Sequence, residues 1–280
     1  MPLILNKEQP LYYQVFGEEH EDPILFIQGV GVIGNGWKPQ TDFLSKFYST
    51  AIFDNRGIGK SIRENAPTNI SLPLMVSDVL SILNTLKWNK VHLIGHSMGG
   101  IIAQEFASQY PNRVKSLSLI CTFPRGKDAA RLTPWVLWVS LKTRIGSKHF
   151  RRKSFLEMIW SKKGLEKNCL IKLHDKISSL IGRDLANQPP ILMKQIMALK
   201  QHDYIFYSAS LTKIPTLILT SKNDPIAKPE YSQKIAEFLP HATYKEFELG
   251  SHAIPIEYSE LINNELLHFI KNQKTTINSH

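Results

Sequence analysis

The sequence predicts an α/β protein with a mostly parallel sheet and helices on both of its faces. Short apolar segments of strand length alternate with longer segments whose apolar residues recur at helical spacing. Several short segments are apolar throughout, as strands buried on both faces of a parallel sheet are. The 280 residues, 42% of them hydrophobic and 21% charged, suffice for a folded core with an insertion and exclude a disordered or fibrous chain.

The first 120 residues predict five strands and two helices. The first strand alternates polar and apolar residues in part and is expected to be half-exposed, whereas the second is apolar throughout. The third runs into the glycine-containing loop 54–59, and the first helix follows the i, i+3, i+4 rule. The predicted strands are 11–17, 23–27, 48–53, 91–95 and 114–120, and the predicted helices are 72–86 and 98–109.

The last 70 residues predict two more strand and helix pairs. The strands are 215–220 and 242–249, and the helices are 229–239 and 256–271.

The segment between these two parts has a different composition. Residues 123–210 hold 17 Lys and Arg against 6 Asp and Glu, a net charge of +11, whereas the rest of the chain has −1. They are rich in Trp and Leu and poor in β-branched runs. We therefore expect a core domain formed by residues 1–122 and 211–280, with residues 123–210 inserted as a helical cap.

Several classes of protein are not expected. The longest apolar run, near 134–141, is too short to span a bilayer, and residues 1–8 do not have the pattern of a secretory signal, so we expect a cytoplasmic protein. Cys121 and Cys169 are then expected to be free, buried thiols. No metal-ligand spacing, nucleotide fingerprint or nucleic-acid motif accompanies the charge, so we expect no metal, cofactor or nucleic-acid partner.

The strongest local motif is Gly95-His96-Ser97-Met98-Gly99, between a predicted strand and a predicted helix. This is the context that a G-x-S-x-G nucleophile turn requires. The two glycines avoid the collisions that side chains would cause two residues before and after Ser97. The hydroxyl is thus expected to be presented at a helix N-terminus, where developing negative charge is stabilised. The alternative is a glycine-rich turn with an incidental serine.

A base and an acid are available later in the chain. Asp224 follows the predicted strand 215–220, and His252 follows the strand 242–249. Both therefore lie at carboxyl ends of strands, on the edge of the sheet where Ser97 is expected. A serine nucleophile needs a base to take its proton and an acid to orient that base, which this set supplies. Taken singly, Asp224 could be a turn residue before a proline and His252 a surface histidine.

Together these motifs resemble the α/β-hydrolase superfamily, in particular its cap-bearing serine esterases, lipases and lactonases. The resemblance extends from about Leu11 to Phe269 and also includes the segments 26–31 and 54–61. It implies an α/β-hydrolase fold with an eight-stranded, mostly parallel sheet. In this family the helical cap follows the sixth strand, which corresponds to the predicted strand 114–120. It also implies that 54–61 is a structural turn, so that Asp54 and Arg56 are not catalytic.

The resemblance also implies an oxyanion hole formed by two backbone N–H groups. One belongs to Met98, after the nucleophile. The other belongs to Val30, in the loop after the predicted strand 23–27, which corresponds to the third strand of the family. The family often has His-Gly where this chain has Gln28-Gly29, a change that leaves the backbone donor but alters the side-chain contacts that shape the loop.

The implied chemistry is acyl transfer with a small-molecule acyl ester as substrate, of small to medium or lipid-like chain length. Ser97 attacks the carbonyl, His252 takes its proton, Asp224 orients the imidazole, and water hydrolyses the acyl-enzyme. Thioesterase, lactonase, carbon–carbon hydrolase and cofactor-free perhydrolase activities remain open with the same triad, as does a slow-turnover ligand receptor. A serine at this turn argues against haloalkane dehalogenases and epoxide hydrolases, which use Asp there.

Two interpretations of the basic segment are open. It contains Trp135, Trp138 and Trp160 beside basic runs at 148–153 and 162–163, a composition typical of interfacial elements. The cap could therefore contact an anionic membrane peripherally and pass lipid-derived esters to Ser97. In the other interpretation, the tryptophans line an acyl pocket and the lysines form a solvated face.

Overall fold

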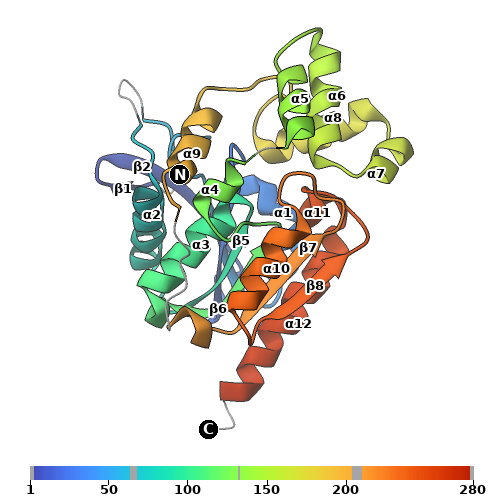
Figure 1. Cartoon of the computed structure of the whole chain (residues 1–280). Coiled ribbons are helices and arrows are strands. Elements are labelled where there is room, and N and C mark those ends of the chain that lie inside the picture. The colour runs from blue at the N-terminus through green and yellow to red at the C-terminus, as the bar shows by residue number, and fades with distance from the viewer. Residues whose placement is uncertain (1–2, 64–67, 132, 204–209, 278–280) are drawn as a thin grey trace.

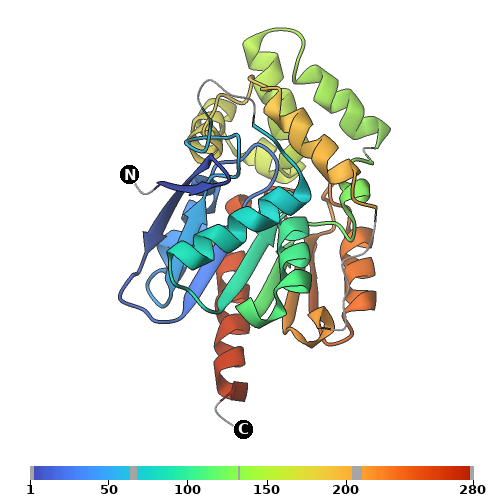
Figure 2. The same ribbon diagram turned by 90° about the vertical axis from the view of Figure 1, so that its left-hand side faces the viewer.

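A computed structural model describes residues 3–63, 68–131, 133–203 and 210–277, and it has the predicted eight-stranded sheet with helices on both faces (Figure 1, Figure 2). The strands are β1 (Leu3–Asn6), β2 (Gln9–Phe16), β3 (Pro23–Ile27), β4 (Ser49–Phe53), β5 (Val91–His96), β6 (Val114–Ile120), β7 (Thr216–Ser221) and β8 (Thr243–Phe247). The core helices are α1 (Lys38–Leu44), α2 (Leu72–Thr85), α3 (Met98–Gln109), α10 (Pro229–Phe238), α11 (Ile254–Glu257) and α12 (Ser259–Ile277).

The strand order is β1-β2-β4-β3-β5-β6-β7-β8. The first two strands pair antiparallel, and so do β2 and β4, whereas every other neighbouring pair is parallel. All residues of β3, β4 and β7 are buried, as their continuous apolar runs predict. Because β3 to β8 run in the same direction, the loops that follow β3, β5, β6, β7 and β8 meet at one edge of the sheet.

The helices cover the two faces of the sheet in separate groups. The helices α2 and α3 pack against each other, and α3 contacts β5 and β6. On the other face, α1 packs against α12. The main core lies between these layers and the sheet, with large, fully buried side chains that include Trp37, Phe26 and Phe106.

Between β6 and β7 the described residues form helices only. These are α4 (Gly126–Ala129), α5 (Pro134–Lys142), α6 (Lys148–Ile159), α7 (Lys162–Lys167), α8 (Leu170–Ile181), α9 (Ile191–Lys200) and a 3-10 turn, Leu211–Lys213. The helices α5 to α8 lie together at the top of Figure 1, beyond the edge where the strands end. They enclose a small apolar cluster of their own, which includes Phe155, Trp160 and Ile177. No helix in the described part of the chain is long and apolar enough to cross a membrane.

The structure differs from the sequence prediction in three elements. The strand β1 and the short helix α1 do not appear in the apolar pattern, because each is too short to show a period. The predicted single helix 256–271 is two helices, α11 and α12, separated at Tyr258, whose φ of −123° and ψ of 50° are not helical. The carboxylate of Glu257 accepts hydrogen bonds from Ser161, which anchors the end of α11 to the inserted helices.

The two cysteines also differ in their surroundings. Both are free, as predicted, but only Cys121 is buried. Cys169 is exposed at the N-cap position of α8.

Candidate active site

Ser97 lies at the turn between β5 and α3, where the sequence places it. Its φ of 54° and ψ of −119° are strained for a residue with a side chain. The two flanking glycines make this turn possible: a Cβ at Gly95 would collide with the carbonyl oxygen of Gly99, and a Cβ at Gly99 with that of Ile27. Larger residues at either position would push the turn away from the sheet, so the motif fixes the backbone that presents Ser97.

The structure brings Ser97, His252 and Asp224 together. The Oγ atom of Ser97 lies 3.0 Å from Nε2 of His252, and Nδ1 of His252 lies 2.7 Å from Oδ2 of Asp224. Because the carboxylate accepts from Nδ1, the imidazole has Nε2 free to accept from the serine hydroxyl. The other oxygen of Asp224 accepts from the backbone N–H groups of Ile226 (2.8 Å) and Ala227 (2.9 Å), which hold the carboxylate in place.

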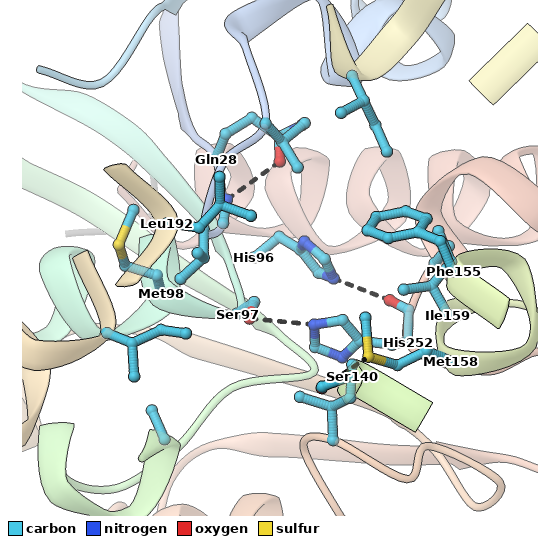
Figure 3. A pocket seen from close by; sticks show the side chains of 18 of the residues that line it. Gln28, His96, Ser97, Met98, Ser140, Phe155, Met158, Ile159, Leu192 and His252 are labelled. Atoms are coloured by element: carbon cyan, nitrogen blue, oxygen red, sulfur yellow. Dashed lines mark hydrogen bonds between the residues drawn. The ribbon is translucent and has the colours of Figure 1, made fainter. Parts of the chain in front are cut away.

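His96, between the strand and the nucleophile, supports the position of His252. Its Nε2 lies 2.9 Å from the carbonyl oxygen of His252, so it donates to that oxygen, as Figure 3 shows. Burial lowers the pKa of His96 to about 3, with a smaller contribution from His252. The imidazole is therefore neutral at physiological pH and adds no charge beside His252. The sequence analysis assigned no role to this residue, although its place beside Ser97 was a signal.

The resemblance assigns an oxyanion hole to the backbone N–H groups of Met98 and Val30. Met98 is the first residue of α3, and Val30 lies in the loop after β3. Neither N–H group has an acceptor among the described residues, and both residues line the pocket above Ser97. Between β3 and Val30, the side chain of Gln28 turns back and its Oε1 accepts from the Gly29 N–H at 3.1 Å.

The loop after β3 is also held by the inserted helices. The N–H of Gly31 donates to Oε1 of Gln195 in α9 at 2.9 Å, and the carbonyl oxygen of Gly31 accepts from Nη1 of Arg183 at 2.6 Å. Gln195 is fully buried, and burial lowers the pKa of Arg183 to about 10. Both polar groups of Gly31, next to the candidate donor Val30, are thus paired with side chains from the basic segment. No local motif marks these two residues, so sequence reasoning did not find them.

A residue after β6 completes the surroundings of the triad. Cys121 is buried with a φ of 46°, and burial, with the nearby charge of Asp224, raises the pKa of its thiol. The next residue, Thr122, donates from Oγ1 to the carbonyl oxygen of Ser97 at 2.6 Å. These two residues connect the end of β6 to the candidate triad. In the sequence, only their position directly after the predicted strand 114–120 indicated that they lie near the site.

Asp54 and Arg56 hold loops, in agreement with the turn that the resemblance implies. The carboxylate of Asp54 accepts from the N–H groups of Gly34 and Lys60, each at 2.8 Å. Arg56 pairs with Asp78 on α2 and lies away from the pocket.

A pocket of 430 Å³ opens directly above the triad. Its wall is mostly apolar: Phe155, Met158 and Ile159 come from α6 and Leu192 from α9 (Figure 3). Polar side chains outside the candidate triad also line it, among them those of Arg144, Arg183 and Gln188. This volume and lining suit a small organic molecule with an apolar part. Among the described residues no three His, Cys, Asp or Glu side chains gather in the way that would hold a metal ion.

The tryptophans of the basic segment do not line this pocket. Trp135 and Trp138 are 46% and 57% exposed on α5, and Trp160 is buried in the small apolar cluster. The interpretation in which they form an acyl pocket is therefore wrong. Val136, Leu137 and Leu141 of the same helix line the pocket instead.

A second Ser-His-Asp array lies at the opposite edge of the sheet. The Oγ of Ser116 is 2.8 Å from Nδ1 of His92, and Nε2 of His92 is 3.3 Å from Oδ1 of Asp22. Ser116 and His92 are 1% and 2% exposed, and neither lines any of the pockets described for this chain. The hydrogen bond between Ser116 and His92 joins β5 to β6, whereas Nε2 of His92 makes no hydrogen bond among the described residues.

Comparisons with known proteins agree with this arrangement. A model of the alpha/beta hydrolase fold family matches residues 22–258. A protein of Azorhizobium caulinodans with the curated name "Putative carbamate hydrolase RutD" is 26% identical over 273 residues, which cover 96% of this chain and 98% of that protein.

Solved structures show the same fold. The "Putative non-heme bromoperoxidase BpoC" of Mycobacterium tuberculosis H37Rv superposes with a TM-score of 0.77 at 25% identity, covering 94% of this chain and 96% of that one. The enol-lactonase of Burkholderia xenovorans LB400 superposes with a TM-score of 0.76 at 22% identity, covering 96% and 100%.

Proposed function

Since this chain belongs to the α/β-hydrolase fold family, we propose that it is a serine hydrolase that cleaves carboxylic esters, with Ser97 as nucleophile. The observation that carries the proposal is the hydrogen-bonded chain from Ser97 through His252 to Asp224 at the floor of an apolar pocket. In this proposal, residues 123–210 form the cap that supplies most of the wall of the pocket.

The reaction follows from the directions of the hydrogen bonds. The Oγ of Ser97 attacks the ester carbonyl while Nε2 of His252 takes its proton, and Asp224 stabilises the resulting imidazolium through Nδ1. The protonated His252 then gives its proton to the leaving alcohol. In the second half, His252 takes a proton from water, which attacks the acyl carbonyl. The acid is released when the bond to Oγ of Ser97 breaks and His252 returns that proton to Oγ.

The free N–H groups of Met98 and Val30 are the donors for the oxyanion in this mechanism. Each such donor contributes about 3 to 4 kcal/mol to stabilising the transition state in enzymes of this kind. Because both donors are backbone groups, the Gln28 found in place of the usual histidine does not remove them.

The pocket favours an ester over a small polar substrate. A carbamate, which the name of the Azorhizobium relative indicates, presents the same kind of carbonyl to the nucleophile. The largely apolar lining, however, matches a substrate with an apolar acyl or alcohol part better than a small carbamate. Lactones, thioesters and carbon–carbon bonds beside a ketone would be attacked by the same Ser97.

The test is hydrolysis of p-nitrophenyl esters of increasing acyl length by the wild-type protein and by Ser97→Ala. We expect turnover by the wild type, with a preference for an acyl chain that fills the pocket, and a loss of about 10³-fold or more in kcat in the variant. Ser179→Ala, which removes an exposed serine on α8, is the matched control and should retain full activity.

A fluorophosphonate probe supplies a second readout, because it labels an activated serine without requiring the right substrate. We expect labelling of the wild type and of Ser179→Ala, mapped by mass spectrometry to Ser97, and none in Ser97→Ala. Labelling without hydrolysis of any ester would redirect the substrate search to lactones, thioesters, carbamates and diketones. The absence of both would contradict the proposal.

A further inference from the structure

The helix α5 exposes apolar side chains that a globular surface normally buries. Trp135, Leu137, Trp138 and Leu141 are all about half exposed, whereas Val136 and Val139 are buried. At helical spacing, positions 137, 138 and 141 share one side of the helix, opposite the buried valines. We call these four exposed residues the α5 apolar face. The helix α5 lies at the end of the molecule opposite the last turns of α12 (Figure 1).

Basic residues surround this face. From 131 to 153 the chain has seven Lys and Arg and no Asp or Glu. Five of these cations lie within 4.0 Å of a carboxylate oxygen, and three carboxylates serve them all: Asp128 for Arg131, Glu157 for Lys142 and Lys153, and Asp184 for Lys148 and Arg152. Arg144, in the turn after α5, is exposed and has no carboxylate partner among the described residues. Two further exposed apolar residues, Ile145 and Phe150, lie in and just after the same turn.

The α5 apolar face continues into the mouth of the pocket. Leu137 and Leu141 are about half exposed and also line the pocket above Ser97, as does Arg144. A molecule that leaves an apolar phase in contact with this face would therefore meet apolar side chains at the edge of the pocket.

We propose that the α5 apolar face docks on the surface of an anionic phospholipid bilayer. Exposed Trp and Leu surrounded by Lys and Arg match the two layers of such a surface, since the apolar rings reach the acyl boundary while the cations meet the phosphates. A second copy of this chain fits less well, because it would bring two strongly basic segments together. Docking does not require the proposed ester hydrolysis, and it can be tested without any substrate.

The experiment is sedimentation of the whole protein with vesicles, at low and high salt. One set of vesicles is pure phosphatidylcholine and the other an equal mixture of phosphatidylcholine and phosphatidylglycerol. We expect binding to the anionic vesicles, weakened by salt, and little binding to the neutral ones. The double variant Trp135→Gln and Trp138→Gln should bind the anionic vesicles about tenfold or more weakly.

Two controls separate the apolar and the basic contributions. Phe238→Gln replaces a residue on α10 that is 44% exposed, close to the exposure of Trp135, and should bind like the wild type. Lys148→Gln with Lys153→Gln removes two exposed cations of α6 and should reduce the preference for anionic over neutral vesicles several-fold.

Quenching of tryptophan fluorescence by lipids with brominated acyl chains locates the contact. Trp135 and Trp138 are the most exposed tryptophans, whereas Trp37 and Trp160 are buried. Trp88 is partly buried against the main core, before β5 and at the edge of the sheet opposite the pocket, so quenching of the wild type must disappear in the double variant. Equal binding to neutral and anionic vesicles, no binding at all, or quenching that survives in the double variant would each overturn the proposal. A dimer in solution that the double variant dissociates, without vesicle binding, would assign the face to a second copy instead.

Discussion

His96 illustrates how a single buried side chain can connect the site to the stability of the fold. The ring lies beside that of His252, with centroids 4.8 Å apart, and donates to the backbone of that residue. A protonated His96 would place a second cation beside the imidazolium that forms during the proposed reaction. Its low pKa keeps the ring neutral, so the site contains one group that changes charge and one that does not.

This burial predicts a specific loss of stability in acid. The unfolded imidazole takes up a proton below its ordinary pKa of 6.5, whereas the folded one does so only near pH 3. The contribution of His96 is therefore fully present above about pH 6.5 and falls by about 1.4 kcal/mol per pH unit as the pH drops between these values. Urea unfolding of the wild type and of His96→Gln from neutral pH to pH 4 measures the difference in slope. Identical slopes would show that His96 is not held neutral by the fold.

At the scale of elements, the loop after β3 depends on α9 for its shape. Gly31 has a φ of 67°, and its Cα lies against Leu192 so closely that a Cβ there would approach Cγ of that residue to 2.9 Å. Together with the hydrogen bond from Gly31 to Gln195, this packing means that α9 holds the loop that carries Val30 in place.

We therefore expect Gln195→Met to impair ester hydrolysis without removing any reacting group. The substitution leaves the buried N–H of Gly31 without an acceptor, which releases the loop and misplaces the Val30 donor. Ester kinetics should show kcat lower by about tenfold, with KM changed much less. Lys194→Met, an exposed change on the same helix, serves as the control. A higher KM with an unchanged kcat would instead make Gln195 a residue that only shapes the pocket.

At the scale of the whole molecule, a buried ion pair connects the first strands to the first large helix. The side chains of Arg56 and Asp78 are 3% and 1% exposed, with Nε of Arg56 2.6 Å from Oδ2 of Asp78. Asn6 of β1 donates to the same carboxylate at 2.7 Å, and Arg56 also donates to the carbonyl oxygen of Asn69. Four stretches of chain thus meet at one ion pair, three of them at its carboxylate.

Removing that charge is expected to destabilise the fold globally. Asp78→Asn would leave the buried guanidinium unpaired, which costs about 3 to 5 kcal/mol in comparable cases. The exposed pair of Lys38 and Asp42 provides the control, because Asp42→Asn should cost less than about 1 kcal/mol. Urea unfolding measures both. A loss for Asp78→Asn as small as that of the control would show that Arg56 finds other partners or water.

The features that could be predicted from the sequence are those determined by short continuous segments of the chain. The buried strands, the helix that begins at Met98 and the three residues of the candidate triad follow from apolar runs and from loops at strand ends. The hydrogen bond of Gln195 to Gly31 joins residues 164 positions apart, and no pattern within a segment encodes such a contact. The direction in which Trp135 and Trp138 point was likewise open, because apolar residues occupy almost all sides of α5 and its period does not distinguish an inward from an outward face.

The array of Ser116, His92 and Asp22 provides an internal control for covalent labelling of Ser97. It has the same three functional groups as the candidate triad within one polypeptide, but with the ring nitrogens exchanged and no access for a reagent. Any electrophile that modifies Ser97 and spares Ser116 in the folded protein is responding to access and backbone geometry, and not to the presence of a serine beside an imidazole.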